Sequence, residues 1–260
     1  MKRTLLSELI AWKDKLGRLP LILRGARQVG KTWLLNEFGK TEFEDVLYIN
    51  FENAQNLKDV FEGDISPGRI IDLLGALHGK RIQPHKTLLI FDEVQEIPRA
   101  LTSLKYFAEQ APEYVICCAG SLLGVALHSG TSFPVGKVDF LTLLPLTFEE
   151  FLLSLGEGDL SDFVRRDGLT DIPKPMIDKL TDYLKLYFII GGMPAAVNAW
   201  IETHDFSVVT GKQRDILDTY ENDFSKHAPK NIVPKLRYLW NSIPAQLAKE
   251  NKKFLYGLVR

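Results

Sequence analysis

Gly25-Ala26-Arg27-Gln28-Val29-Gly30-Lys31-Thr32 stands between a short apolar run, Leu19–Arg24, and a stretch with the apolar spacing of a helix, Lys31–Phe38. These eight residues match the pattern GxxxxGK[ST] without a gap, and they have the preceding strand and following helix that the pattern requires. Glycines let successive backbone N–H groups face inward, and the N-terminal end of the helix adds positive potential. The sequence therefore predicts a phosphate-binding loop rather than an ordinary tight turn with an exposed lysine.

The chemistry of such a loop assigns roles to individual side chains. Lys31 would reach the β- and γ-phosphates of a nucleotide, and the Thr32 hydroxyl would ligate Mg²⁺. We expect the nucleotide to be contacted by consecutive residues: Gly25, Ala26, Arg27, Gln28, Val29, Gly30, Lys31, Thr32 and Trp33.

Four more apolar runs predict strands, at residues 46–51, 87–91, 114–119 and 138–144. Helical patterns separate most of them, and one helix is expected to start at Pro67 after an N-capping Ser66. Apolar strands alternating with helices indicate an α/β fold with a parallel five-stranded sheet covered on both faces. Right-handed crossovers would then place the C-terminal ends of the strands, with Gly25, Asp92 and Ser121, along one edge.

The run at 87–91 ends in two carboxylates, Asp92 and Glu93. Asp92 would hold Mg²⁺, and Glu93 would polarise a water for attack on the γ-phosphate, which favours hydrolysis over transfer to a small acceptor. A pair of surface acids is the alternative interpretation. Ser121 could touch the γ-phosphate as a sensor or cap the helix that begins at Leu122. Lys31, Glu93 and Ser121 are accordingly the candidate catalytic residues.

The strand signals fade after residue 146, where Thr147-Phe-Glu-Glu150 has the pattern of a capping box. Residues 156–175 are rich in Gly, Asp and Pro and are expected to form a loop. Helical patterns lie near 147–155, 176–190, 194–203, 212–226 and 232–250. We therefore expect an α/β core at 1–145, followed by a smaller helical region.

Composition excludes some classes of protein. The 260 residues carry a net charge of −1, which rules out a wholly basic nucleic-acid binder, but eight basic residues against one acid fall within 226–260. That segment predicts either a nucleic-acid surface or the solvated face of terminal helices. The adjacent Cys117 and Cys118 cannot readily bridge, because neighbouring side chains in a strand point to opposite faces. With no signal peptide and no apolar stretch of spanning length, we expect a cytoplasmic protein without membrane contact.

Several motifs together carry a family resemblance. They are Leu21–Thr32, Ile90–Gln95, Ala119–Leu123, Leu144–Leu152 and Gly191–Pro194. The chain resembles the AAA+ superfamily, and within it the ATPases of bacteria and archaea that carry a C-terminal domain with an endonuclease-like fold. The resemblance implies ATP and Mg²⁺ as cofactors, with Lys31 and Thr32 on phosphate and metal, Asp92 as the magnesium residue, Glu93 as the catalytic base and Ser121 as the sensor.

The same resemblance implies an AAA+-like core at 1–145, a helical lid at 146–230, and at 231–260 the start of a winged-helix-like or linker segment. Because the chain stops at Arg260 within that segment, we expect it to be truncated before the C-terminal domain. Relatives commonly carry arginine where this chain has Lys137, so a homo-oligomer with a trans-acting finger stays open. Lysine lacks the planar fork of arginine, and slow hydrolysis in a nucleotide-state switch would fit that difference.

Three functions follow from these observations. The leading one is Mg²⁺-dependent ATP hydrolysis that drives a switch. A nucleic-acid-binding module based on residues 226–260 is the second. A small-molecule or nucleotide kinase is the third, and its product would be a phosphorylated acceptor instead of free phosphate.

Overall fold

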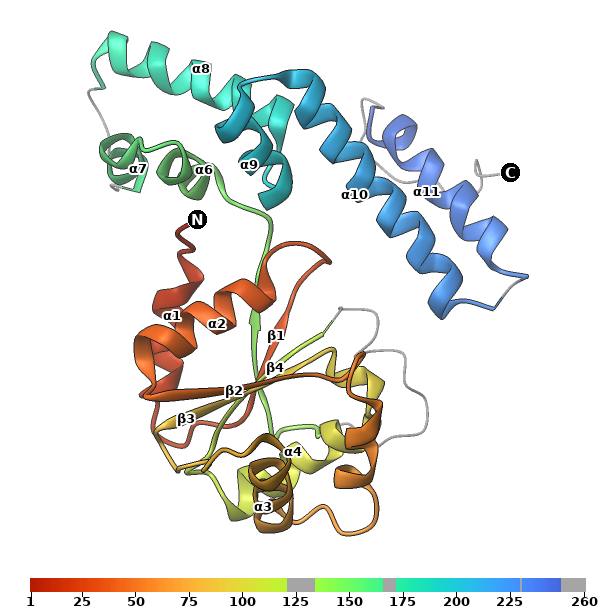
Figure 1. Ribbon diagram of the computed structural model, residues 1–260. Helices are drawn as coiled ribbons and strands as arrows, with labels where there is room; N and C mark the ends of the chain where they lie inside the picture. The colour runs from red at the N-terminus through yellow and green to blue at the C-terminus, as the bar shows by residue number, and fades with distance from the viewer. Residues whose placement is uncertain (121–133, 166–171, 230, 249–260) are drawn as a thin grey trace. The chain divides into compact units, whose positions relative to one another are not determined.

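The computed structural model describes residues 1–120, 134–165, 172–229 and 231–248. Its centre is a five-stranded sheet in the order β2-β3-β4-β1-β5, in which every neighbouring pair is parallel (Figure 1). The strands are β1 (Leu21–Arg24), β2 (Asp45–Asn50), β3 (Thr87–Asp92), β4 (Val115–Ala119) and β5 (Asp139–Thr142). The predicted α/β class and parallel sheet are confirmed.

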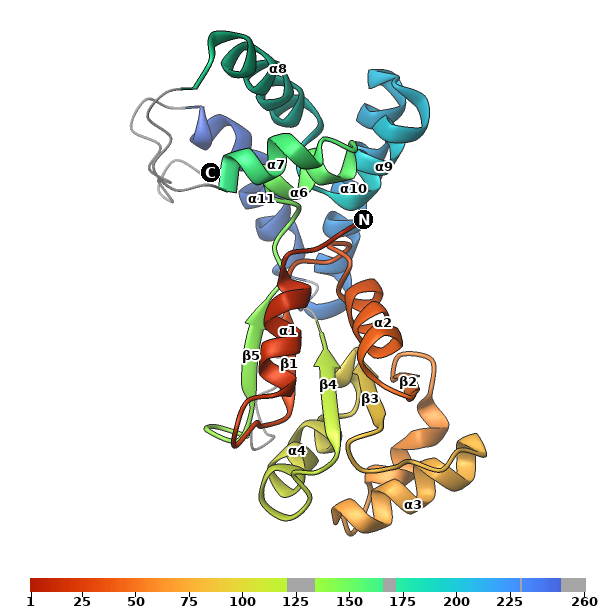
Figure 2. The same ribbon diagram turned by 90° about the vertical axis from the view of Figure 1, so that its left-hand side faces the viewer.

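Helices cover both faces of this sheet, as Figure 2 shows from the side. One face packs against α1 (Leu5–Lys13) and α2 (Lys31–Glu42). The other packs against the 3-10 helix η1 (Gln55–Phe61), α3 (Pro67–His78) and α4 (Pro98–Gln110). This double cover explains why β3 and β4 are apolar without alternation, since every residue of both strands is buried.

The two cysteines lie on opposite faces of β4, as the sequence predicts. Cys117 packs with the α1–α2 layer and Cys118 with the α3–α4 layer, and both thiols are free and fully buried. Burial raises the pKa of both thiols well above the ordinary range. These cysteines are therefore core residues.

Helix starts bear out most of the capping predictions. Thr147 and Glu150 form the expected capping box at α6 (Phe148–Ser154), with Thr147 Oγ1 accepting from Glu150 N at 3.2 Å and Glu150 Oε2 accepting from Thr147 N at 3.1 Å. Pro67 opens α3 as predicted. Ser66 is the N-cap residue of α3 as predicted, but its side chain makes no capping bond, because its hydroxyl donates to Asp64 Oδ2 at 2.8 Å instead.

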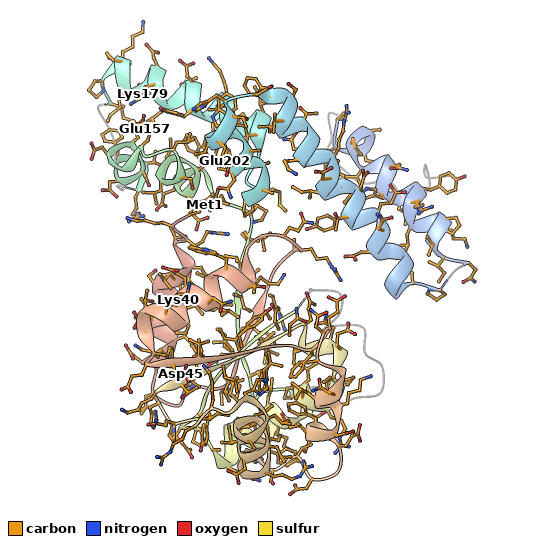
Figure 3. All side chains as sticks on the ribbon, in the orientation of Figure 1. Met1, Lys40, Asp45, Glu157, Lys179 and Glu202 are labelled. Atoms are coloured by element: carbon orange, nitrogen blue, oxygen red, sulfur yellow. The ribbon has the colours of Figure 1, made fainter. Side chains whose placement is uncertain are left out.

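The expected loop at 156–175 contains a helix, α7 (Gly158–Arg165), which precedes α8 (Lys174–Ile190). Glycine and aspartate at its start suggested a loop, but Leu160 and Ser161 are buried, so packing overrides local propensity. Glu157, which precedes α7, connects it to α8, because it accepts from Lys179 Nζ at 2.9 Å and from the Tyr183 hydroxyl at 2.6 Å; Glu157 and Lys179 are labelled in Figure 3.

By its internal contacts the chain divides into Met1–Pro194 and Ala195–Arg260. The second unit holds most of α9 (Pro194–Thr203), together with α10 (Phe206–His227) and α11 (Val233–Leu247). Within it Tyr220 stacks on Trp240, with ring centroids 5.9 Å apart, and Arg237 pairs with Glu221 at 3.0 Å. The domain boundaries expected from the sequence, at 145 and 230, stay predictions.

Across the part of the chain described, no single helix is long and apolar enough to cross a membrane; only α8 and α9, counted together across their bend, reach that length and hydropathy.

Candidate functional site

The loop between β1 and α2 forms where the sequence predicts it. Gly25 ends β1 against the chain that leaves β5, and a Cβ at this position would lie 2.4 Å from the Leu143 carbonyl oxygen. Gln28 and Gly30 have positive φ, at 63° and 93°, which bends the backbone back before α2 starts at Lys31. The first glycine of the motif is thus required by a close backbone approach, and the second by its conformation.

Lys31 folds back over its own loop. Its Nζ donates to the carbonyls of Gly25 at 3.0 Å and Ala26 at 2.9 Å, and the residue is buried. Burial lowers the pKa of the Lys31 amine, an effect that the carboxylates of Glu93 and Asp92 oppose. A buried ammonium held over a backbone loop, close to two acids, is well placed to meet a polyanion.

Thr32 and Asp92 come together from distant parts of the sequence. Thr32 Oγ1 donates to Asp92 Oδ2 at 2.7 Å, and Asp92 is buried at the end of β3. The register explains this position, because Asp92 pairs with Asn50 of β2 and Ala119 of β4 at the C-terminal edge of the sheet. A hydroxyl and a carboxylate are oxygen donors of the kind Mg²⁺ takes, usually one or two from the protein.

Tyr48 is a site residue that sequence reasoning missed. Its hydroxyl donates to Asp92 Oδ2 at 2.9 Å, so one carboxylate oxygen receives two hydroxyl groups. Burial and this hydrogen bond raise the pKa of Tyr48 to about 12. The signal was available in principle, since Tyr48 lies three residues before the end of the strand predicted at 46–51, but the pairing of this strand with β3 is a tertiary fact.

Glu93 is held in an unusual backbone conformation. It has φ 50° and ψ 45°, and its N–H donates to Asp92 Oδ1 at 3.0 Å. The 3-10 turn η2 (Val94–Glu96) then brings back Gln95, whose Nε2 donates to Glu93 Oε2 at 2.5 Å. Gln95 is buried, and its Oε1 has no partner among the described atoms. The orientation of Glu93 is therefore set by its neighbours on both sides.

A cleft of about 960 Å³ opens beside α2, on the side of the N-terminal residues. Trp33 and Leu34 of α2 form one wall, Met1–Thr4 and α1 form another, and Glu149, Leu153 and Arg165 close it. Trp33 is 46% exposed, so its ring is available to a ligand. The cleft is largely apolar and of a size typical of small-molecule sites.

The remaining predicted residues divide into three cases. Val29 is fully buried, so only its backbone is available to a ligand, whereas Ala26 and Gln28 are exposed. Lys137, the residue at the position of the suspected finger, pairs with Glu109 at 2.9 Å. Ser121 lies outside the described residues, and its role as a sensor stays a prediction.

Two protein-family models match parts of this chain. A family model described as an AAA domain matches residues 17–152, which is more than half of the chain and includes Lys31, Thr32, Asp92 and Glu93. The chain belongs to the AAA domain family. Nucleotide-binding ATPases make up this family, and the parallel sheet with its glycine loop is its expected fold. A second model, for a domain of unknown function (DUF8612), matches residues 181–259 of this AAA domain protein.

Solved structures resemble this AAA domain protein only distantly. PCH-2 from C. elegans shares 13% identity, with a TM-score of 0.42, over 94% of this chain and 68% of its own. AMPPCP-bound DnaA from Aquifex aeolicus shares 15%, with a TM-score of 0.39, over 95% and 78%. Drosophila ORC bound to DNA shares 15%, with a TM-score of 0.46, over 95% and 72%. A search of the curated proteins found no match.

Proposed function

We propose that this AAA domain protein binds ATP with Mg²⁺ and hydrolyses it, with the nucleotide state acting as a switch. The observation that carries the proposal is the 2.7 Å contact between Thr32 of the loop and Asp92 of β3, which unites the two halves of the predicted site. Lys31, whose amine sits over the loop carbonyls, supplies the cation for the phosphates.

The residues fit a magnesium nucleotide on chemical grounds. A Cβ at Gly25 would collide with Leu143, so the backbone of the loop is pressed close to the sheet and its far side is left for phosphate oxygens. Thr32 and Asp92 would hold Mg²⁺, which would neutralise charge on the phosphates when bound. The cleft that Trp33 lines begins one residue beyond Thr32 and would receive the nucleoside.

Glu93 is the group that makes hydrolysis the preferred reaction. Its carboxylate would accept a proton from the attacking water, and the bond from Gln95 restrains where that carboxylate points. Asp92 already accepts from Thr32, Tyr48 and the Glu93 N–H, so it is committed to positioning rather than to proton transfer.

The decisive experiment compares Glu93→Gln with Glu96→Gln, the same chemical change three residues further on. Glu93→Gln should bind Mg-ATP like the wild type and lose turnover by about a hundredfold or more, because general-base catalysis is removed. Glu96→Gln should retain both properties, and Lys31→Ala should lose nucleotide binding. Wild-type turnover in Glu93→Gln would contradict the assignment of the base. Release of free phosphate, rather than a phosphorylated acceptor, would separate the ATPase from a kinase.

Binding of nucleic acid through residues 226–260 stays a hypothesis based on charge. Arg237, one of the basic residues of this segment, pairs with Glu221 within the second unit, and Trp240 of the same segment stacks on Tyr220. A salt-sensitive association with DNA that is lost on deleting 226–260 would support it.

A further inference from the structure

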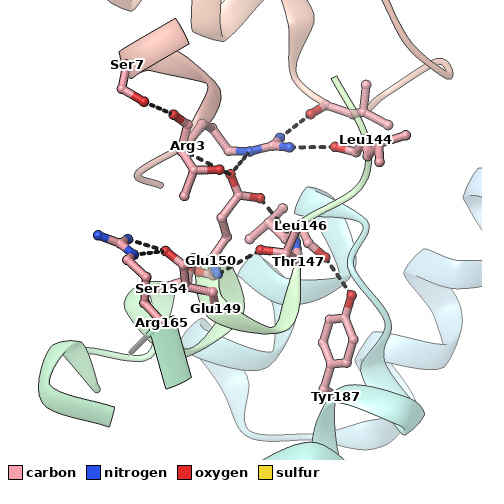
Figure 4. A network of polar contacts seen from close by, with 12 residues as sticks. Arg3, Ser7, Leu144, Leu146, Thr147, Glu149, Glu150, Ser154, Arg165 and Tyr187 are labelled. Carbon is pink, nitrogen blue, oxygen red and sulfur yellow. Dashed lines mark hydrogen bonds and ion pairs between the residues drawn. The ribbon is translucent and has the colours of Figure 1, made fainter. Parts of the chain in front are cut away.

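A buried polar network that includes one carbonyl of the phosphate loop is centred on Arg3. The side chains of Arg3 and Glu150 are only 4% and 2% exposed, and their Nε and Oε1 atoms lie 3.1 Å apart. Figure 4 shows the guanidinium between Glu150 of α6 and Leu144, which follows β5. Burying an arginine is costly because its guanidinium loses hydration. The ion pair with Glu150 alone therefore does not explain why Arg3 is buried.

Each nitrogen of the Arg3 guanidinium has a separate acceptor. Nε donates to Glu150, Nη2 donates to the Leu144 carbonyl at 2.5 Å, and Nη1 donates to the Val29 carbonyl at 2.7 Å. Glu150 Oε1 also accepts from the Thr4 N–H at 2.7 Å, which fixes the chain that carries Arg3. The third acceptor, Val29, belongs to the phosphate loop.

The contact with Val29 determines how one peptide group of the loop is turned. The Val29 carbonyl and the Gly30 N–H belong to the same planar trans peptide, so they point in opposite directions. With the carbonyl bonded to Arg3, the Gly30 N–H faces away from Arg3. Gly30 is the N-cap of α2, where free N–H groups are presented to anions. A flipped peptide would present a carbonyl there and repel phosphate.

We propose that Arg3 is a positioning residue for the phosphate loop, which holds the Val29–Gly30 peptide so that the Gly30 N–H donates to a bound phosphate. This inference rests on the proposed nucleotide binding and assigns a role outside the loop motif itself. Lysine cannot replace arginine here, because one ammonium cannot span three acceptors fixed by a planar fork. Arg3→Lys keeps a positive charge opposite Glu150 but loses the hydrogen bond to the Val29 carbonyl.

Steady-state kinetics and Mg-ATP titration of the full chain test this role. Arg3→Lys should raise KM and Kd for Mg-ATP roughly tenfold with little change in kcat, since a contact present in both ground and transition states is lost. A purely structural role would instead reduce the folded fraction, which lowers apparent kcat and leaves KM unchanged. That second result would overturn the proposal.

Two variants serve as controls. Arg69→Lys removes an arginine that also donates to three backbone carbonyls, those of Asp59, Val60 and Asp64, and it should leave KM unchanged. Glu150→Gln should lower the melting temperature, because Arg3 loses its counter-charge, yet leave KM near the wild-type value, because the amide oxygen still accepts from Arg3 Nε and the Thr4 N–H. If Glu150→Gln raised KM as much as Arg3→Lys, the effect would come from the ion pair and the proposal would fall.

A measurement on the wild type covers the case in which Arg3→Lys does not fold. In ¹⁵N-labelled protein the Gly30 amide proton should shift downfield on addition of Mg-ATP, and a stationary resonance would overturn the proposal. A wild type that does not bind Mg-ATP refutes the proposed function together with this inference. A wild type that binds, with an unaffected Arg3→Lys, refutes this inference alone.

Discussion

Gly192→Ala tests whether the turn formed by Gly191 and Gly192 holds in place the segment that follows β5, which contains Leu146. Gly192 follows α8, and a Cβ at this position would lie 2.3 Å from the Leu146 carbonyl oxygen and 3.0 Å from the Leu146 nitrogen. Leu146 N also donates to the Gly192 carbonyl at 2.7 Å. Leu146 immediately precedes the capping box of α6, so neither partner is a side chain that can rotate away.

The expected loss of stability follows from three contributions. Relieving a backbone clash of this depth costs about 1–3 kcal/mol, and losing the Leu146 hydrogen bond costs about 1 kcal/mol. Alanine returns about 0.5–1 kcal/mol by restricting the unfolded chain. The net destabilisation is about 1–3.5 kcal/mol, which corresponds to a fall in Tm of about 2–14 °C for a domain of this size.

Scanning calorimetry and urea unfolding of the full chain would measure the loss of stability caused by Gly192→Ala. Gly68→Ala is the matched control, because Gly68 lies in the first turn of α3 without a positive φ, and an alanine Cβ there would meet nothing within 4 Å. It should be neutral or slightly stabilising. The reasoning is refuted if Gly192→Ala melts at or above the wild-type temperature.

Two further predictions concern Tyr48 and the cysteines. The pKa of Tyr48 is raised to about 12 in the folded chain, against about 10 when unfolded, so stability is fully present below pH 10 and declines as pH rises toward 12. Tyr48→Phe should therefore flatten the fall in unfolding free energy over that window, and parallel curves for the two proteins would exclude the effect. Cys117 and Cys118 should resist a thiol reagent at pH 8 in the native protein and react only on denaturation, because burial raises their pKa; rapid native labelling would contradict it.

Local sequence predicted the secondary structure correctly where one hydrophobic periodicity or one motif dominates. The apolar runs gave all five strands within a few residues, and Thr147 to Glu150 gave a capping box that forms in full. It failed at α7, whose glycine and two aspartates favour a loop until burial of Leu160 is taken into account. At Ser66 the N-cap position was predicted correctly, but the hydroxyl bonds to a neighbouring acid, Asp64, instead of capping the helix.

The candidate site likewise contains some residues that the sequence predicted and others that only the structure revealed. Gly25, Gly30, Lys31, Thr32, Asp92 and Glu93 were found from the sequence, because the loop motif is contiguous and parallel strands must bring their C-terminal ends to one edge. Tyr48, Gln95 and Arg3 were not. Each donates a hydrogen bond to a partner that the sequence does not pair with it: Asp92, Glu93 and Val29.

The sequence by itself determined the fold class, the position of the glycine loop between β1 and α2, and the acidic strand end, since these depend on backbone conformation and on the burial pattern of short segments. Only the tertiary structure decided what surrounds them: which hydroxyls meet Asp92, what holds Glu93, and which cation lies behind Val29. The physical reason is that a hydrogen bond needs two groups within about 3 Å, and strand register and helix packing fix that distance. Arg3 and Glu150 are 147 positions apart, yet they form one buried pair against the loop.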